Sequence, residues 1–227
     1  MTTIGILGTG RMGVRLARML AQVGHRVVLG SRDPARAERI AAGLTLPQIE
    51  PGTYAEAVRA PFIMPASFIR DGLFDLLEDL RPQLDGKVLI DITNPFNGDY
   101  TDFILDWNTS AAEELQKRFP KARVVGAFKN VWWECFDAPV FDGHTSDVLV
   151  VSDDAAAKRD FLSLVDKTPF RYLDAGGLKN ARTVERMTLL SGELGQRCGY
   201  FPRMNWRLVG EPWEVGRADH VRELISR

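Results

Sequence analysis

A glycine-rich loop near the N-terminus is the part of this sequence with the clearest chemical use. The run Gly8-Thr9-Gly10-Arg11-Met12-Gly13 has the G-x-G-x-x-G spacing and directly follows the apolar run Ile4–Leu7. In such a loop Gly8 permits a tight turn, Gly10 lets a pyrophosphate approach the backbone, and Gly13 lets helix and strand pack closely. The helix that begins here would offer free N–H groups and a partial positive charge to phosphates. An ordinary strand–turn–helix can share this spacing, but the place in a first βα unit favours a dinucleotide site.

The residues at the end of the second expected strand indicate which dinucleotide would bind. NAD-binding folds place an acidic residue roughly 20 residues after the glycines to bond the ribose 2′-hydroxyl. Here the stretch Val28-Leu29-Gly30-Ser31-Arg32 has no acid, Arg36 follows one helical turn later, and Asp33 before Pro34 is typical of a helix N-cap. Either arginine alone could belong to a solvated basic face. Together with the serine hydroxyl they suit a 2′-phosphate, and the sequence predicts NADP(H).

Residues that commonly perform proton transfer, nucleophilic attack or metal binding are scattered along this sequence. The histidines His25, His144 and His220 are isolated, and no His, Cys, Asp and Glu cluster has metal-ligand spacing. We expect His25 to be structural, His144 to lie in a solvated loop and the Cys135 thiol to be buried. Hydride transfer between ring cofactors needs few side chains, because the rings carry the chemistry. We therefore expect no metal, and the absence of a catalytic constellation fits a redox reaction.

Composition narrows the range of partners. The 227 residues include 29 Lys and Arg against 30 Asp and Glu, a formal charge of −1 at pH 7, without the basic excess of nucleic-acid-binding domains. No apolar run approaches the roughly 20 residues of a membrane span, and the first residues do not resemble a signal peptide. Two cysteines far apart in sequence suit a reducing compartment. We expect a soluble, cytoplasmic protein that binds neither nucleic acid nor membrane.

Short β-branched runs alternate with amphipathic stretches along most of the chain, the pattern of successive βαβ units. The expected strands are 4–7, 25–29, 62–64, 87–92, 124–128, 148–152 and 171–173. Helices are expected over 12–23, 34–42, 73–80, 111–119, 155–165 and 178–199, with a short one opened by the Thr53–Glu56 capping box. Residues 96–107 lack a period and are expected to form a loop. The fold class predicted is α/β, a Rossmann-type doubly wound, mostly parallel sheet with a small helical C-terminal appendage.

The glycines at Gly176-Gly177 suggest where the chain divides. We expect an NADP-binding Rossmann domain over 1–176, followed by a C-terminal helical segment and tail over 177–227. The break should bring the last helix over the crevice at the carboxyl ends of the strands, where open α/β sheets bind ligands. The tail from Tyr200, with Trp206 and Trp213, has no clean period, and its aromatic residues could supply a dimer interface.

Several stretches go beyond a generic dinucleotide fold. They are Gly30-Ser31-Arg32, Asp91-Ile92-Thr93-Asn94-Pro95, Val124-Val125-Gly126-Ala127-Phe128 and, as the most specific, Leu173-Asp174-Ala175-Gly176-Gly177-Leu178-Lys179-Asn180-Ala181-Arg182. Over about residues 1–190 the chain resembles the family of NADP-dependent oxidoreductases typified by the coenzyme F-420:NADP oxidoreductases. That family also includes NADPH-dependent ferric reductase domains. The tail from Tyr200 does not match it.

The resemblance implies a place for each part of the cofactor. In that family NADP lies along the sheet edge, and a deazaflavin or flavin ring stacks on the nicotinamide for direct hydride transfer. Pro65 and Ala66 match the turn on the nicotinamide side, and Asn94 and Pro95 would lie near the same ring. The other matching dinucleotide contacts, beside the three glycines of the loop, are Thr9, Arg11, Met12, Ser31, Arg32 and Arg36.

The segment Ala127-Phe128-Lys129-Asn130-Val131 matches the part of the family that faces the hydride acceptor. This chain departs from the pattern there: the deazaflavin enzymes have a histidine in place of Lys129 and small residues in place of Trp132-Trp133. Lys129 could neutralise negative charge on the acceptor. The indoles and Phe136 could stack on a flat ring, or pack in the core or a dimer interface. We expect a narrower pocket than in the deazaflavin enzymes, with acceptor-side contacts from Lys129, Asn130, Val131 and Trp132.

The function that follows is an NADPH-dependent oxidoreductase passing hydride to or from a small-molecule acceptor, a deazaflavin such as coenzyme F-420 or a flavin. The resemblance also implies a homodimer. One alternative is NADPH-dependent reduction of a small carbonyl or imine, but such enzymes need a long helical second domain and fewer than 60 residues remain after the last expected strand. Another is a non-catalytic NADP(H)-sensing module, because a fold alone does not establish turnover.

Overall fold

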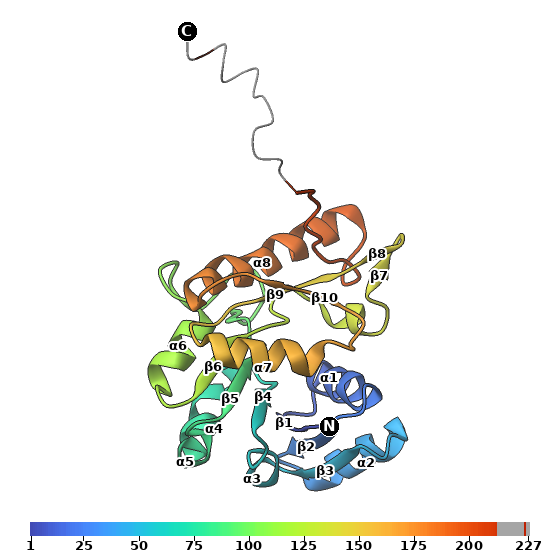
Figure 1. Cartoon of the computed structure of the whole chain (residues 1–227), viewed down its shortest axis with the longest axis vertical. Coiled ribbons are helices and arrows are strands. Elements are labelled where there is room, and N and C mark those ends of the chain that lie inside the picture. The colour runs from blue at the N-terminus through green and yellow to red at the C-terminus, as the bar shows by residue number, and fades with distance from the viewer. Residues whose placement is uncertain (213–224, 226–227) are drawn as a thin grey trace.

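Six parallel strands form the main sheet of the protein, whose computed structural model describes residues 1–212 and 225 (Figure 1). Their order across the sheet is β3-β2-β1-β4-β5-β6, and every neighbouring pair is parallel. The bounds are Thr3–Leu7 for β1, Arg26–Ser31 for β2, Ile49–Thr53 for β3, Phe62–Pro65 for β4, Val88–Asp91 for β5 and Arg123–Gly126 for β6. The strand order reverses between β1 and β4, so the predicted Rossmann-type, doubly wound sheet is confirmed.

Helices cover both faces of this sheet, because successive strand residues point to opposite sides. In β1, Ile6 faces one core layer together with Leu20 of the first helix, whereas Leu7 faces the other. The first layer is covered by α1 (Arg11–Gln22), α2 (Pro34–Leu44) and α7 (Ala155–Val165). The second is covered by α3 (Tyr54–Ala57), α4 (Leu73–Asp79), α5 (Arg81–Leu84) and α6 (Ala111–Arg118).

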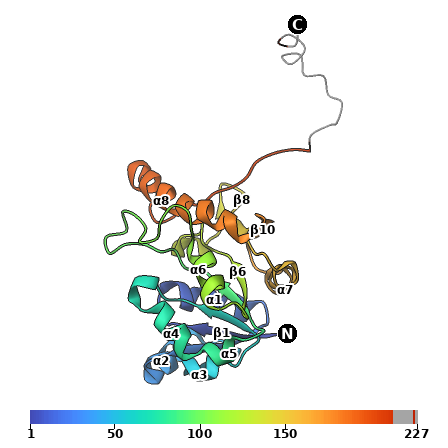
Figure 2. The same cartoon turned by 90° about the vertical axis from the view of Figure 1, so that its left-hand side faces the viewer.

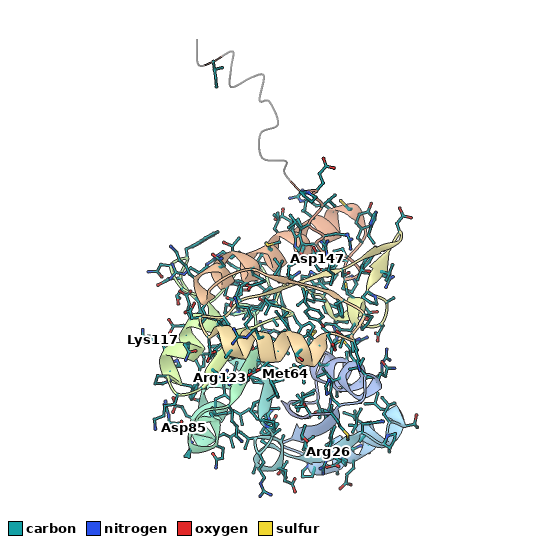
Figure 3. All side chains as sticks on the ribbon, viewed as in Figure 1. Arg26, Met64, Asp85, Lys117, Arg123 and Asp147 are labelled. Carbon is teal, nitrogen blue, oxygen red and sulfur yellow. The ribbon has the colours of Figure 1, made fainter. Side chains whose placement is uncertain are left out.

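A second group of elements lies beyond β6, in the upper part of the molecule in Figure 1 and Figure 2. It contains the parallel pair β9 (Asp147–Val150) and β10 (Arg171–Asp174), the antiparallel pair β7 (Val140–Phe141) and β8 (His144–Thr145), and α8 (Ala181–Cys198). Gly126 and Val151 exchange backbone hydrogen bonds of 2.8 and 3.0 Å, which join this group to the end of β6. Asp147 lies in the same layer (Figure 3), where its carboxylate pairs with Arg171 at 2.6 Å. The predicted helical C-terminal part is confirmed.

Side-chain caps begin four of the helices, α2, α3, α6 and α7. Asp33 accepts a hydrogen bond from the Arg36 N–H at 3.2 Å with Pro34 in the first helical position, and Thr53 and Glu56 form the predicted capping box. Ser110 caps α6 and Asp154 caps α7. Each cap satisfies an N–H group that the first helical turn leaves unpaired.

Four local features differ from the predictions. Strand β3 was missed, because Pro51 and Gly52 disguise it; Pro51 is tolerated since β3 lies at the sheet edge. Helix α2 runs past Gly43 and ends at Leu44, because the next residue, Thr45, takes the left-handed conformation at φ 52°. Strand β6 ends before Phe128, which also has a positive φ of 57° and turns the chain into the interior. The small β7–β8 ladder was also not foreseen.

Short 3₁₀ helices complete the described chain: η1 (Ile69–Asp71), η2 (Trp133–Phe136) and η3 (Leu178–Asn180). Cys135 is buried, as predicted, and burial raises the pKa of its thiol to about 11. His144 is exposed in β8, and the His25 ring nitrogen Nε2 lies 2.8 Å from the Leu164 carbonyl oxygen. Within residues 1–212 and 225, no helix has the length and apolar character to cross a bilayer. Trp213 and His220 lie outside the described residues.

Candidate functional site

The glycine loop between β1 and α1 has the geometry that a phosphate cradle requires. Gly8 has φ 137°, a conformation that side chains rarely adopt, and a Cβ there would lie 2.8 Å from the Ala66 carbonyl oxygen. A Cβ on Gly13 would lie 2.2 Å from the Gly8 carbonyl oxygen. A Cβ on Gly10 would meet nothing within 4 Å. Gly8 and Gly13 are therefore needed for chain packing, whereas Gly10 leaves open space in front of the α1 N-terminus.

A groove with a volume of about 360 Å³ begins at this loop. It lies at the carboxyl ends of β1 and β4, where the strand order reverses and open α/β sheets bind ligands. Its walls include seven of the predicted contacts: Gly8, Thr9, Gly10, Ser31, Arg32, Arg36 and Ala66. Asp33, Tyr54 and Ser67 also line it and were not predicted as contacts. Tyr54 directly follows the missed strand β3, so recognition of that edge strand would have indicated it.

The two arginines of the groove have different surroundings. Arg36 donates from Nε to Thr9 Oγ1 at 3.0 Å and from Nη2 to the Thr9 carbonyl oxygen at 3.3 Å, so it ties α2 to the glycine loop. Arg32 is exposed and has no ion-pair partner in the described part of the chain. The Ser31 hydroxyl accepts the Asp33 N–H at 3.1 Å. Arg32 is thus the cation available to an incoming anion, while Arg36 shapes the loop.

The predicted contacts Arg11 and Met12 lie in the first turn of α1. The Arg11 guanidinium stacks 4.9 Å from the Trp133 ring centroid, and Met12 packs partly buried against the core. The next turn of α1 continues the link, because Arg15 contacts Glu134 at 3.1 Å and Asp137 at 2.7 Å. The helix that begins at the glycine loop is thereby fixed to η2 by ion pairs.

Buried polar groups lie behind Ser67, a residue of the groove wall. Thr93 donates from Oγ1 to the Ser67 carbonyl oxygen at 3.0 Å, the next residues Asn94 and Pro95 are buried, and Pro65 is buried at the end of β4. Asn94 donates from Nδ2 to the Lys129 carbonyl oxygen at 2.7 Å, while its Oδ1 has no hydrogen-bond partner among residues 1–212 and 225. A buried acceptor without a partner is costly. A bound group with an N–H donor would satisfy it, so these residues fit the amide end of a nicotinamide.

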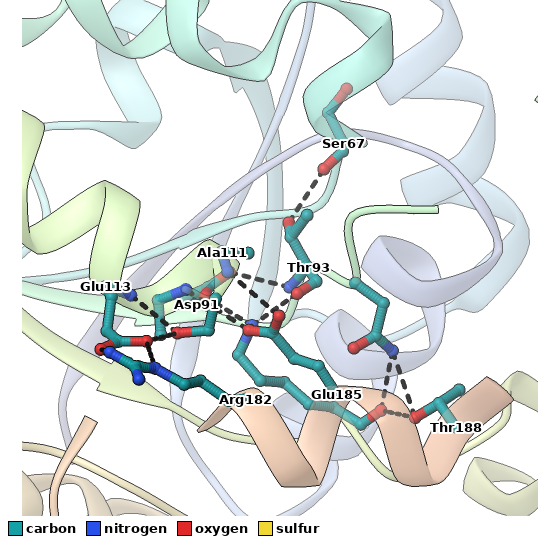
Figure 4. A network of polar contacts seen from close by, with 12 residues as sticks. Ser67, Asp91, Thr93, Ala111, Glu113, Arg182, Glu185 and Thr188 are labelled. Carbon is teal, nitrogen blue, oxygen red and sulfur yellow. Dashed lines mark hydrogen bonds and ion pairs between the residues drawn. The ribbon is translucent and has the colours of Figure 1, made fainter. Parts of the chain in front are cut away.

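The side chains of Lys129 and Asn130, which the sequence analysis places on the acceptor side, lie in the interior. Both residues are 0% exposed. The Lys129 ammonium pairs with Asp91 and Glu185 (Figure 4), and the Asn130 amide donates to the Asp147 carbonyl oxygen at 2.8 Å. Burial by itself lowers the pKa of the Lys129 ammonium, but the two neighbouring carboxylates outweigh it and raise that pKa. The ammonium of this side chain is therefore engaged in internal ion pairs.

Val131 and Phe136 also pack in the core, at 5% and 6% exposure. Trp132 is partly buried and donates from Nε1 to the Ser191 hydroxyl of α8 at 2.9 Å. A Cβ on Gly192 of α8 would lie 3.0 Å from the same indole, so the helix passes directly against it. Phe96 and Phe201 flank Trp132 with ring centroids at 6.3 and 4.9 Å. Of the acceptor-side candidates, Trp132 is the one whose side chain remains partly open.

Comparison with known proteins identifies the relatives of this chain. Residues 3–95 match the family described as NADP oxidoreductase coenzyme F420-dependent. The F420-dependent NADP reductase of Methanothermobacter thermautotrophicus is 32% identical over 196 residues, which cover 81% of this chain and 84% of that protein. The metalloreductase STEAP3 of Rattus norvegicus is 35% identical over 187 residues, which cover 82% of this chain but 36% of that protein. A crystal structure of a candidate F420-dependent NADP reductase from Arthrobacter superimposes with a TM-score of 0.79 at 25% identity, over 88% of this chain and 96% of that one.

The matched region contains the glycine loop, the groove residues Arg32 and Arg36, and the buried amide of Asn94. Fold and relatives together make this protein an NADP-dependent oxidoreductase. With 32% identity across most of both chains, it belongs to the family of F420-dependent NADP oxidoreductases. It spans about a third of the metalloreductase that it also resembles.

Proposed function

We propose that the protein transfers hydride between NADP(H) and a deazaflavin acceptor of the coenzyme F420 type. The observation that carries the proposal is the groove at the strand-order reversal, whose wall includes the exposed Arg32. Beyond Ser67 of that wall, Thr93 contacts the Ser67 carbonyl oxygen, and the adjacent Asn94 has a buried Oδ1 without a hydrogen-bond partner among the described residues. Bound NADPH supplies a hydride from its nicotinamide ring to the acceptor ring, and a solvent proton completes the reduced acceptor. The near full-length relative named for both partners supports this pairing.

The chain's own residues would divide the binding of NADP(H) among them. Arg32 would pair with the 2′-phosphate, because a planar guanidinium matches phosphate geometry. The N–H groups of the first α1 turn would face the pyrophosphate in front of Gly10, where space is open. The nicotinamide would then lie toward Ala66 and Asn94, at the carboxyl ends of β4 and β5.

We place the acceptor on the Trp132 side of that ring. The aromatic group of Trp132, Trp133, Phe96 and Phe201 offers apolar faces against which a flat ring can stack. Helix α8 packs against both Trp132 and Asn94, through Ser191 and Thr188. These bulky contacts favour a narrower acceptor pocket than small residues would leave.

A flavin acceptor is the second candidate. The family resemblance includes NADPH-dependent ferric reductase domains, and the 35% identity to the metalloreductase STEAP3 favours this alternative. Because this chain spans 36% of that protein, the likeness concerns the domain and not the whole activity.

Two structural expectations belong to the same proposal. Residues 1–176 would hold NADP(H) and residues 177–227 would complete the acceptor side, which the contacts of α8 support. The protein would be a homodimer, and the exposed Leu190 and Leu194 on one face of α8 support a second copy there. Light scattering during size-exclusion chromatography should then give twice the chain mass.

The reaction is tested with NADPH carrying deuterium on either face of nicotinamide C4. We expect loss of the reduced nicotinamide absorbance when F420 is present. Mass spectrometry should find one deuterium on the reduced F420 with one of the two labelled cofactors and none with the other. Reduction of a flavin but not of F420 would select the second candidate. Tight NADPH binding without turnover across deazaflavin, flavin, carbonyl and imine acceptors would contradict both and indicate an NADP(H)-sensing module.

A further inference from the structure

Three ionisable side chains meet in the interior beside the segment that joins β5 to α6 (Figure 4). The Lys129 ammonium, in the turn after β6, lies 2.5 Å from Asp91 Oδ2 at the end of β5 and 2.9 Å from Glu185 Oε1 on α8. The side chains are 0%, 0% and 1% exposed. Taking such charges out of water costs several kcal/mol per ion. We call these three residues the buried ion cluster.

The residues of the buried ion cluster also form hydrogen bonds with backbone groups of Thr93 and Ala111. Lys129 Nζ donates to the Thr93 carbonyl oxygen at 2.5 Å, and Asp91 Oδ1 accepts the Thr93 N–H at 2.8 Å. Glu185 accepts the Ala111 N–H at 3.0 Å, at the start of α6. The buried ion cluster therefore forms hydrogen bonds with both ends of the segment that joins β5 to α6.

Lys129 forms hydrogen bonds with two consecutive residues of that segment, with Thr93 through its ammonium and with Asn94 through its backbone carbonyl oxygen. Its ammonium holds Thr93, and its carbonyl oxygen accepts the Asn94 Nδ2 amide at 2.7 Å and also a hydrogen bond from the Thr188 hydroxyl of α8. Because a carbonyl can only accept, Nδ2 must face Lys129 and Oδ1 must face away. The left-handed conformation of Phe128 turns the chain so that Lys129 can make both contacts.

Stability alone does not explain these charges. Replacing a buried ion cluster by apolar residues of similar volume is often neutral or stabilising, so such a cluster is weak evidence for a stabilising role. What this one provides is a fixed orientation of Asn94, the buried amide whose Oδ1 lacks a partner among the described residues. Its three members come from β5, the turn after β6, and α8, which are the elements that surround that amide.

We propose that Lys129 and Glu185 are positioning residues for the nicotinamide ring of NADP(H). They touch neither cofactor nor acceptor; they hold Thr93 and Asn94 so that the ring and its amide are presented to the acceptor in one orientation. This inference rests on the proposed function, because it concerns the nicotinamide end of the same groove. The buried ion cluster is not expected to affect binding of the 2′-phosphate.

The test compares NADPH with 2′-phospho-ADP-ribose, which has the same phosphate end but no nicotinamide. Lys129→Met removes the cation, and Glu185→Gln keeps the size while leaving Lys129 and Asp91 as a balanced pair, so Glu185→Gln is the variant that retains the fold. In both we expect 2′-phospho-ADP-ribose affinity within about twofold of wild type. Turnover at saturating NADPH should fall roughly tenfold to a hundredfold, as for a reactant misplaced by about an ångström.

Lys158→Met is the matched control, because Lys158 is also buried and ion-paired, with Asp174 at 2.6 Å, but lies on α7 away from Asn94. It should change neither ligand affinity nor turnover. Wild-type turnover at saturating NADPH in Glu185→Gln, or an equal loss of affinity for both ligands, would overturn the positioning role. Failure of the wild-type protein to bind NADPH would instead contradict the proposed function, so the two failures are distinct.

Discussion

The two regions that we propose hold the phosphates and the nicotinamide are built on opposite principles. At the proposed phosphate end the guanidinium of Arg32 is exposed and Gly10 faces open space. At the proposed nicotinamide end Asn94, Lys129 and Glu185 are buried and hydrogen-bonded or ion-paired, and the Asn94 Oδ1 has no hydrogen-bond partner among the described residues. An exposed charge attracts a phosphate without a rigid setting, whereas a reacting ring must be held in one orientation. Damage at the first end should therefore cost affinity, and damage at the second should cost stability or turnover.

The largest effect should come from Lys129→Ala. The change leaves Asp91 and Glu185 buried without their cation, and breaking a buried pair from one side costs about 3–5 kcal/mol. Urea unfolding measures this loss. Lys121→Ala is the matched control, because Lys121 pairs with Asp85 at 2.9 Å but is 76% exposed, and such pairs contribute roughly 1 kcal/mol or less. Equal unfolding midpoints for the two variants would contradict the claim that loss of the buried cation costs more stability than loss of the exposed one.

Arg32→Ala should act on affinity alone. A charge-assisted contact with the 2′-phosphate contributes about 1.5–3 kcal/mol, so NADPH binding should weaken roughly tenfold to a hundredfold while NADH binding stays the same. Calorimetric titration of both cofactors decides this. Arg39→Ala serves as the control, since Arg39 is exposed on α2, the helix that follows Arg32, and its guanidinium lies 3.9 Å from the Asp33 carboxylate. Equal losses for NADPH and NADH in Arg32→Ala would disprove the 2′-phosphate assignment.

Two glycines should separate packing from ligand contact. Gly13→Ala places a Cβ 2.2 Å from the Gly8 carbonyl oxygen and should destabilise the fold by about 1–3 kcal/mol. Gly10→Ala meets nothing within 4 Å, so its melting temperature should match wild type while its Cβ obstructs the pyrophosphate and weakens NADPH. Unchanged NADPH affinity in Gly10→Ala would show that the phosphates do not pass over this residue.

The smallest expected effect is a loss of stability at low pH, at Asp154, which lies away from both of these regions. The hydrogen bond from Arg123 and that from the Ala157 N–H lower the pKa of Asp154 to about 2, below its ordinary 3.8. The unfolded chain then binds the proton more readily, so this contribution is present above about pH 4 and is lost as the pH falls through 2. Because the pair is about a third exposed, it is worth less than about 1 kcal/mol. The melting-temperature difference between wild type and Asp154→Asn should shrink toward zero near pH 2; a constant difference would contradict the shift.

The groove beside the glycine loop was predictable from sequence because its signals are local. The glycine spacing, the Asp33-Pro34 cap and the position of Ser31 and Arg32 after a strand all lie within one βαβ unit, and all of them line or border the groove. The sheet was predictable for the same reason, apart from β3, where Pro51 hides an edge strand.

The environment of Asn94 and Lys129 was not predictable from sequence, because its contacts join elements that are far apart along the chain. Lys129 follows an apolar strand, which suggested a residue at the mouth of the site, whereas it turns inward toward Asp91 and Glu185. The pairing with Asp91 had a signal: both residues lie at or just past the carboxyl ends of neighbouring parallel strands. Glu185 had none, since nothing in the sequence gives the rotation of α8 about its axis.

Calorimetric titration of the wild-type protein with NADPH and with NADH tests the central claim most directly. If Arg32 and the groove around it recognise a 2′-phosphate, NADPH binds at least tenfold more tightly, and the difference narrows as salt screens the exposed guanidinium. Equal affinities for the two cofactors at low salt would contradict the claim that this groove is built for NADP(H).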